Sequence, residues 1–248
     1  MNALFRKDPY PKSACNFLLY LILLFSFHHP SSGQGSKTIN DNFWLDAFVT
    51  TNMGGKFKQN TYISYRRIAG KDHWQQVFFN PAFVYTINKN FQVWGTTVFN
   101  YVKDHSVSQY EVRPYVGLMV NYPRISGFYI QNFFRFEERF FFQNHEGYLS
   151  NNFRARYSVF AFIPLNHREI IDKTVYLWPG AEYYLDLNGT PPVRFINKSR
   201  YTLGVGYQVS KFYRFEICFL EQFSRKNQEE HFANSDRIFR FVNHFLIN

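Results

Sequence analysis

Four histidines are the residues of this sequence that could most directly bind a metal ion. Each has an acidic residue beside it in the chain: the pairs are His73 with Asp72, His105 with Asp104, His145 with Glu146, and His231 with Glu230. Imidazole and carboxylate groups together bind Zn²⁺ and similar ions. The four pairs fall in four different expected loops, where such neighbours are also common by chance. We therefore predict neither a metal ion nor another cofactor, and keep the four histidines as weak candidates.

Nucleophilic catalysis needs a hydroxyl group within hydrogen-bond reach of an imidazole and a third group that orients the ring. Two places offer such residues: His105 with Ser106, and His145 with Ser150 and Asn151. Residues adjacent in an extended chain point in opposite directions, which counts against the first pair. We expect no enzyme, and keep an outer-membrane lipid hydrolase as a distant third interpretation.

Arginine and glutamate are interleaved on one face of several expected strands. Arg135, Glu137 and Arg139 share one face, and Arg154 and Arg156 follow on the next segment. A guanidinium group can satisfy two carboxylates or carbonyl groups at once. If the strands close into a barrel, these side chains line its lumen. The predicted lumen-lining residues are Arg66, Glu111, Arg113, Arg135, Glu137, Arg139, Arg154, Arg156, Glu182, Arg200, Arg214, Glu216 and Arg240.

The elements that position these residues are identified by strict alternation. In Thr174–Leu187 the odd positions are mostly aliphatic or aromatic, whereas the even positions include Glu182 and Asp186. This two-residue period indicates strands with two different faces. Eleven such segments are recognised, at residues 43–50, 56–66, 74–87, 91–102, 109–122, 127–141, 152–163, 174–187, 199–209, 211–223 and 236–247.

Most of these segments have the length of a tilted strand that crosses a bilayer. Tyr and Phe are concentrated near their ends, as in an aromatic girdle, which disfavours a secreted β-sandwich. The sequence therefore predicts an all-β fold, a transmembrane antiparallel up-and-down barrel of about 10–12 strands. Bacterial barrels of one chain have even strand numbers. Either segment 43–50 plugs the lumen or pairs at the seam, or a twelfth strand is present.

The expected connections alternate in length, as in outer-membrane barrels. Short turns are expected on one side and long loops on the other, with 165–173 as an exceptionally long turn on the short side. The long loops are predicted near residues 67–73, 103–108, 142–151, 188–198 and 224–235.

The N-terminal segment has the pattern of a secretory signal peptide. Three basic residues precede the apolar run Phe17–Phe27, and small residues follow it. We place cleavage after Gly33, so residues 1–33 are the signal peptide and residues 34–248 the barrel domain. Cys218 is the one cysteine after the predicted cleavage point, so we expect no disulfide within the barrel.

Composition and charge exclude several functional classes. The formal net charge is +10, but basic residues are spread over the strands rather than clustered, which argues against nucleic-acid binding. Outer-membrane lipid and anionic lipopolysaccharide are the simpler partners. No Gly-rich phosphate loop, cysteine-pair zinc motif or EF-hand loop occurs in the sequence.

The chain resembles the uncharacterised outer-membrane β-barrel proteins of domain-of-unknown-function family 2490. The resemblance lies in strand patterns and covers nearly all of the predicted barrel domain. The matching segments are Phe43–Leu45, Tyr65–Arg67, Arg135–Arg139, Asn152–Tyr157, Ile163–Asn166, Glu182 and Ser199–Tyr207. It implies an outer-membrane location in a Gram-negative bacterium and no established activity. The last residue is Asn248 rather than an aromatic one, so Phe245 is the candidate signal for the barrel-assembly machinery.

Two functional hypotheses follow. The first is a small pore or transporter that admits polar, anionic solutes through an Arg/Glu-lined lumen. The alternative is a closed structural or accessory barrel that docks a partner through its long extracellular loops.

Overall fold

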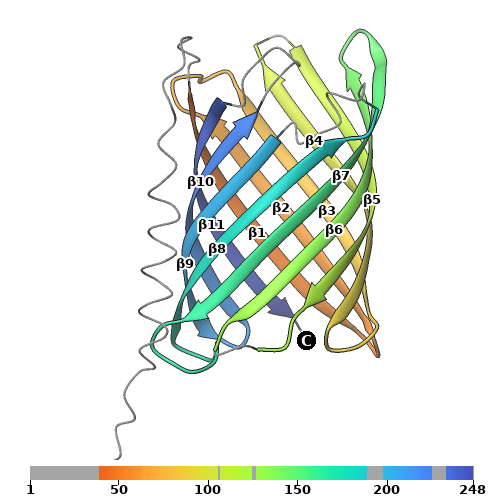
Figure 1. Cartoon of the computed structure of the whole chain (residues 1–248). Coiled ribbons are helices and arrows are strands. Elements are labelled where there is room, and N and C mark those ends of the chain that lie inside the picture. Colours follow the sequence, from red (N-terminus) through yellow and green to blue (C-terminus); the bar gives the residue numbers. More distant parts are fainter. Residues whose placement is uncertain (1–38, 106, 125–126, 189–197, 225–232, 248) are drawn as a thin grey trace, which may run out of the picture. The chain divides into compact units, whose positions relative to one another are not determined.

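The computed structural model describes residues 39–105, 107–124, 127–188, 198–224 and 233–247, and these form a closed barrel of eleven strands (Figure 1). The predicted all-β barrel is therefore confirmed, whereas the predicted signal peptide lies outside the described residues. In the described part of the chain, no helix is long and apolar enough to cross a membrane. The strands are β1 Asn40–Gly54, β2 Phe57–Ile68, β3 Gln75–Thr86, β4 Phe91–Asp104, β5 Val107–Asn121, β6 Tyr129–Gln143, β7 Gly147–Pro164, β8 Thr174–Asp186, β9 Lys198–Ser210, β10 Tyr213–Ser224 and β11 Ala233–Ile247.

The two-residue period separates an inner from an outer face on every strand. On β1, Asp46 is 1% exposed and its side chain lies inside the barrel, whereas its neighbour Leu45 is 55% exposed on the outer face. Phe136 and Ile217 are likewise more than half exposed on β6 and β10. The outer surface is thus rich in exposed apolar side chains, which is consistent with a membrane barrel.

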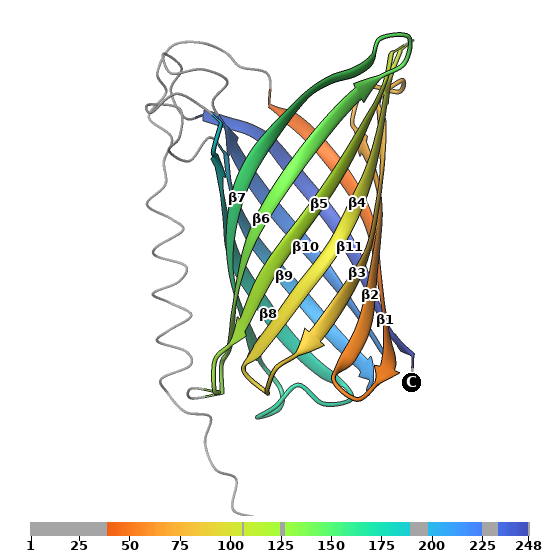
Figure 2. The ribbon, with the colours of Figure 1, turned by 90° about the vertical axis from the view of Figure 1, so that its right-hand side faces the viewer.

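The barrel closes with an odd number of strands, so the expectation of an even number is wrong. Consecutive strands pair antiparallel, but β1 pairs with β11 in parallel, with Phe43 opposite Phe239 (Figure 2). In an up-and-down barrel of eleven strands the first and last run in the same direction, so they meet as a parallel pair. Of the three alternatives for the first segment, pairing at the seam is the one observed.

Two of the five predicted long loops are tight turns. Two residues join β4 to β5, and three join β6 to β7. Residues assigned to the loops continue the ladder instead, as in the pairs Lys103 with Ser108 and Phe142 with Tyr148. The predicted long turn 165–173 is present between β7 and β8. There the Asn166 side chain accepts a hydrogen bond from the Val175 amide at 2.8 Å and so holds the turn.

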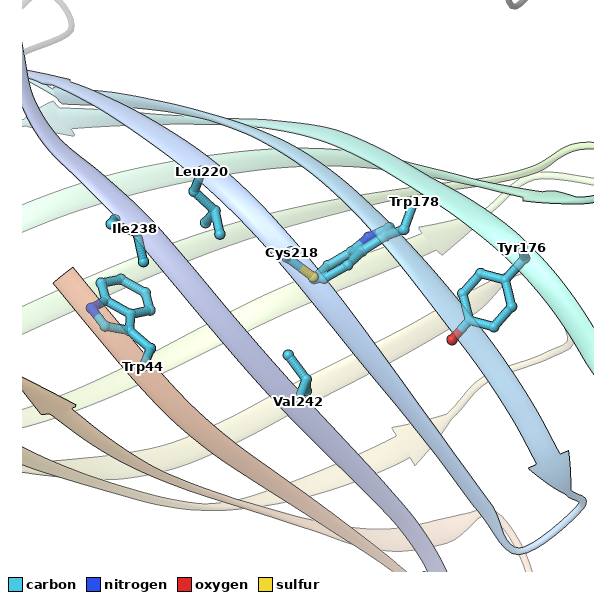
Figure 3. Packing of buried hydrophobic residues seen from close by; sticks show 7 residues of the cluster. All are labelled: Trp44, Tyr176, Trp178, Cys218, Leu220, Ile238 and Val242. Atoms are coloured by element: carbon cyan, nitrogen blue, oxygen red, sulfur yellow. The ribbon is translucent and has the colours of Figure 1, made fainter. Parts of the chain in front are cut away.

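One part of the barrel interior is packed like a hydrophobic core. This seam cluster is shown in Figure 3 and consists of Trp44, Tyr176, Trp178, Cys218, Leu220, Ile238 and Val242, which come from β1, β8, β10 and β11. Large rings fit against the wall because β9 presents glycine to them. A Cβ atom on Gly206 would lie 2.2 Å from Cζ of Tyr176, so only glycine leaves room for this ring.

Candidate functional site

The lumen contains a cavity of about 1280 Å³ that is lined from both ends of the barrel. Ile68 and Trp74 line it where β2 ends and β3 begins, at the loop side. Asp172 and Lys211 line it at the opposite side, in the turns before β8 and β10. The interior space therefore extends along the strands rather than forming a closed central pocket.

The structure places the thirteen predicted lumen residues on the inner wall. All except Glu137 line the cavity directly. Glu137 lies beneath the arginines that contact it, and its side chain has no exposed area. Alternation positions these residues, because each strand contributes its charges at every second residue.

Nine of these residues form a charged wall on β5–β9, in two ion-paired groups that meet at the Tyr184 ring. At its β5 end, Glu111 accepts two hydrogen bonds of 2.8 Å from Arg113, a bidentate pair. Arg139 Nε donates to the same carboxylate at 2.6 Å. We call this set the charged wall; its members are Glu111, Arg113, Arg135, Glu137, Arg139, Arg154, Arg156, Glu182 and Arg200.

Glu137 is the centre of the charged wall. Arg154, its cross-strand neighbour on β7, donates to it through Nε at 2.9 Å and also through Nη2. Arg135 and Arg113 approach the same carboxylate to 3.7 Å and 3.9 Å. Three guanidinium groups thus share one buried carboxylate.

Glu182 on β8 closes the wall toward β9. Arg156 binds one of its oxygens, and Arg200 lies 3.7 Å from the other. Ser158 and Tyr184 donate hydrogen bonds of 3.2 Å to the same carboxylate. The carboxylate therefore has a partner at each oxygen.

Two smaller ionic contacts lie beside the seam cluster. Asp46 binds Arg240 and accepts a hydrogen bond of 2.9 Å from the Tyr62 hydroxyl. Glu216 accepts a bond of 2.7 Å from Tyr176, and His244 lies 3.2 Å from it. Each of these carboxylates binds close to the seam, whereas the charged wall extends over five strands.

Arg66 differs from the other lumen arginines. Among the described residues it forms no ion pair, and its guanidinium donates to the Ser64 and Tyr62 hydroxyls at 2.9 Å and 3.1 Å. Its Cζ lies 3.8 Å from the centre of the Trp44 ring, and Arg200 Cζ lies 4.9 Å from the same ring. Two guanidinium groups therefore meet at one indole that lines the cavity.

The lumen carries more positive than negative charge. Eleven basic residues line the cavity, against five acidic residues, and counting the covered Asp46 and Glu137 raises the acidic total to seven. Within the described part of the chain, the balance is thus +4 with histidine neutral. Several buried donors, including Arg135 Nε and Arg156 Nε, also have no hydrogen-bond acceptor there.

A model of a protein family described as "protein of unknown function (DUF2490)" matches residues 41–233, from the second residue of β1 to the first of β11. The chain belongs to the DUF2490 family. The family predicted from the strand patterns is therefore confirmed. No curated protein matches the chain. Because the family description names no activity, the function of this DUF2490 protein has to be inferred from its own lumen and loops.

Sequence reasoning missed the aromatic partners of the lumen arginines in this DUF2490 protein. Trp44 and Tyr184 both face the cavity, and Tyr184 contacts the guanidinium groups of Arg154, Arg156 and Arg200. Their even positions on alternating strands carry the signal that could have found them. Candidates chosen for their charge do not include these aromatic residues.

The structure brings together two of the four candidate histidines. His73 and His105 stack with ring centres 3.4 Å apart, and Asp104 lies beside them. His145 lies in the turn between β6 and β7, outside this group. His231 and Ser106 lie outside the described residues. Within the described part of the chain, His145 makes no hydrogen bond with Ser150, and Asn151 instead donates to Glu138 at 3.3 Å.

Proposed function

We propose that this DUF2490 protein is an outer-membrane barrel of a Gram-negative bacterium whose lumen conducts small polar anions. The exposed apolar residues of the outer face, such as Phe136 and Ile217, support insertion into a bilayer. The predicted signal peptide fits export to that membrane. On this proposal outer-membrane lipid and lipopolysaccharide surround the barrel, and the barrel-assembly machinery inserts it, with Phe245 near the C-terminal end of β11 as the recognition residue.

The observation that carries the anion proposal is the surplus of guanidinium groups along the cavity. Basic residues exceed acidic residues in the lumen by four, and Arg66 has no carboxylate partner among the described residues. A lumen with a net charge in a low-dielectric surrounding concentrates the field and raises the local concentration of counter-ions. Anions are therefore favoured over cations in this space.

The size of the cavity limits the solute. A strand of 15 residues such as β6 is ~50 Å long, and at a tilt of about 40° it spans roughly 38 Å of the barrel axis. A volume of 1280 Å³ spread over this length corresponds to a mean cross-section on the order of 30 Å². A narrow space of this kind favours a small inorganic anion or a short carboxylate over larger solutes.

Conductance of the protein in planar lipid bilayers tests the proposal. A heat-modifiable gel shift first establishes that the barrel is folded. We expect discrete current steps with anion preference, and a reduced preference in Arg66→Gln because its uncompensated charge is lost. Arg67→Gln is the matched control, since Arg67 points outward and contacts Asp72. Equal anion selectivity in the two variants would overturn the assignment of Arg66 as a residue that determines the selectivity.

A closed accessory barrel is the second candidate function. The favouring observation is the charged wall itself, in which Glu111, Glu137 and Glu182 each bind more than one arginine and so fill part of the lumen. In that case the loops would dock a partner. A folded barrel that carries no current in the bilayer experiment would favour this candidate over the pore.

A further inference from the structure

Two turns at the loop side of the barrel meet at a group of three metal-binding side chains. His73 lies between β2 and β3, Asp104 ends β4, and His105 follows in the turn to β5. His73 Nε2 lies 3.1 Å from an Asp104 carboxylate oxygen. One potential ligand atom of each of the three residues lies within 4.8 Å of those of the others.

The pairing of β3 with β4 explains this convergence. Gln75 is the first residue of β3 and lies opposite Lys103. Beyond this pair the ladder ends: His73 lies in a turn closed by the hydrogen bond from the Trp74 amide to the Lys71 carbonyl, and His105 lies in the β4–β5 turn with φ of 51°. The last ladder pair therefore brings the two turns side by side, and the rings of His73 and His105 stack there.

From this geometry we propose that His73, Asp104 and His105 form a binding site for a divalent transition-metal ion of the Zn²⁺ type. Zn²⁺ binds two histidine nitrogens and a carboxylate oxygen at about 2.0–2.2 Å, which places tetrahedral ligands roughly 3.3 Å apart. The His73–Asp104 separation already matches this value, whereas the stacked His105 ring has to turn so that one of its nitrogens, now within 4.8 Å of the other two ligand atoms, reaches the same distance. A water molecule would complete the coordination.

The site is open to ions from the solvent. The His73 and Asp104 side chains are 37% and 53% exposed, so binding requires no opening of the barrel. Hard cations such as Mg²⁺ and Ca²⁺ prefer an all-oxygen site, so two imidazoles select against them. The bound ion would join the β2–β3 and β4–β5 connections at one point. This inference is independent of whether the lumen conducts.

Isothermal titration of the full chain in detergent with Zn²⁺ tests the site. We expect one strong binding event in the wild type and affinity weaker by roughly 100-fold or more in His73→Ala and His105→Ala. His145→Ala is the matched control, because His145 also has an acidic neighbour and, like His105, lies in a turn with positive φ, yet no other described histidine groups with it. Unchanged affinity in both site variants, or an equal loss in the control, would overturn the proposal.

A measurement on the unmodified protein removes the dependence on substitutions. Diethylpyrocarbonate modifies exposed imidazoles, and mass spectrometry locates the modified residues. Zn²⁺ at saturating concentration should protect His73 and His105 and leave His145 reactive, while Mg²⁺ should protect none of them. Modification of His73 and His105 that Zn²⁺ does not slow would exclude the site.

Discussion

Two regions of the lumen wall, which overlap on β8, use inward-facing positions in opposite ways. On β5–β9 these positions hold the charged wall, in which every carboxylate is shared by at least two arginines. Around the junction of β1 and β11 they hold the seam cluster, in which Trp44, Ile238 and Val242 pack with little exposed surface. The alternation of side chains along a strand therefore determines which residues face the lumen, but it does not determine whether those residues are charged or apolar.

The contrast indicates that the two regions stabilise the barrel in different ways. The seam joins two strands that are far apart in the chain and pair in parallel. Apolar packing beneath it supplies a non-directional stabilisation of the closure. The charged wall spans strands that are consecutive in the chain and pair antiparallel, where hydrogen-bond geometry is fixed by register. The hydrogen-bonded ion-pair network therefore lies where the backbone already fixes the positions of its residues.

Removing the central carboxylate should have the largest effect on stability. Glu137→Gln leaves Arg113, Arg135 and Arg154 without their common counter-charge in a buried setting. Breaking a buried ion pair on one side costs about 3–5 kcal/mol, and we expect the lower end because glutamine still accepts a hydrogen bond. Urea unfolding in detergent or lipid vesicles, followed by the gel shift, measures the loss.

Glu138→Gln is the control for this experiment. Glu138 is the next residue on β6, faces outward and accepts a bond of 3.3 Å from Asn151. We expect its replacement to change stability by less than ~1 kcal/mol, in the range of exposed pairs. Equal losses in the two variants would show that the charged wall has no special energetic role.

A smaller loss should follow from crowding the seam cluster. In Gly206→Ala the new Cβ would lie 2.2 Å from Cζ of Tyr176, and the ring must move. The movement would break the 2.7 Å hydrogen bond from Tyr176 to Glu216. Overpacking a well-filled core costs about 1–3 kcal/mol, which the same urea titration can resolve.

Gly95→Ala on β4 provides the comparison, because no atom lies within 4 Å of its added Cβ. This variant should be as stable as the wild type or slightly more stable, since alanine restricts the unfolded chain. If Gly206→Ala left the stability unchanged, the Tyr176 ring would be able to move away from β9 at no energetic cost.

The sequence predicted which residues face the lumen, but not how the first and last strands pair or which side chains meet across the lumen. Arg135, Glu137 and Arg154 could be assigned to one face because the period of a strand is two residues. The strand number and the parallel seam could not be decided, since alternation in 43–50 is the same for either direction of pairing. The meeting of Arg66 and Arg200 on Trp44 depends on barrel closure, which a local pattern does not encode.

The histidines show the same limit in the loops. Each of the four has an acidic neighbour in the sequence, so the local pattern gave them equal weight. Of the three that the structure describes, His73 and His105 meet and His145 does not, because β4, which precedes His105, pairs in register with β3, which follows His73. His145 follows β6, which does not pair with β3 or β4. Convergence is thus a property of strand order, which composition cannot supply.

The smallest effect is expected at an exposed ion pair that resembles the charged wall only in residue type. Arg124 and Glu169 join the turn after β5 to the turn before β8, with Nη1 and Oε1 2.5 Å apart. Glu169 is 60% exposed, so water and salt screen the pair and solvate whichever partner remains. Glu169→Gln should leave the urea midpoint unchanged within error. If it instead destabilised the barrel as much as Glu137→Gln, burial and sharing could not explain the difference between the two pairs, and the turn contact would have to be treated as part of the closure.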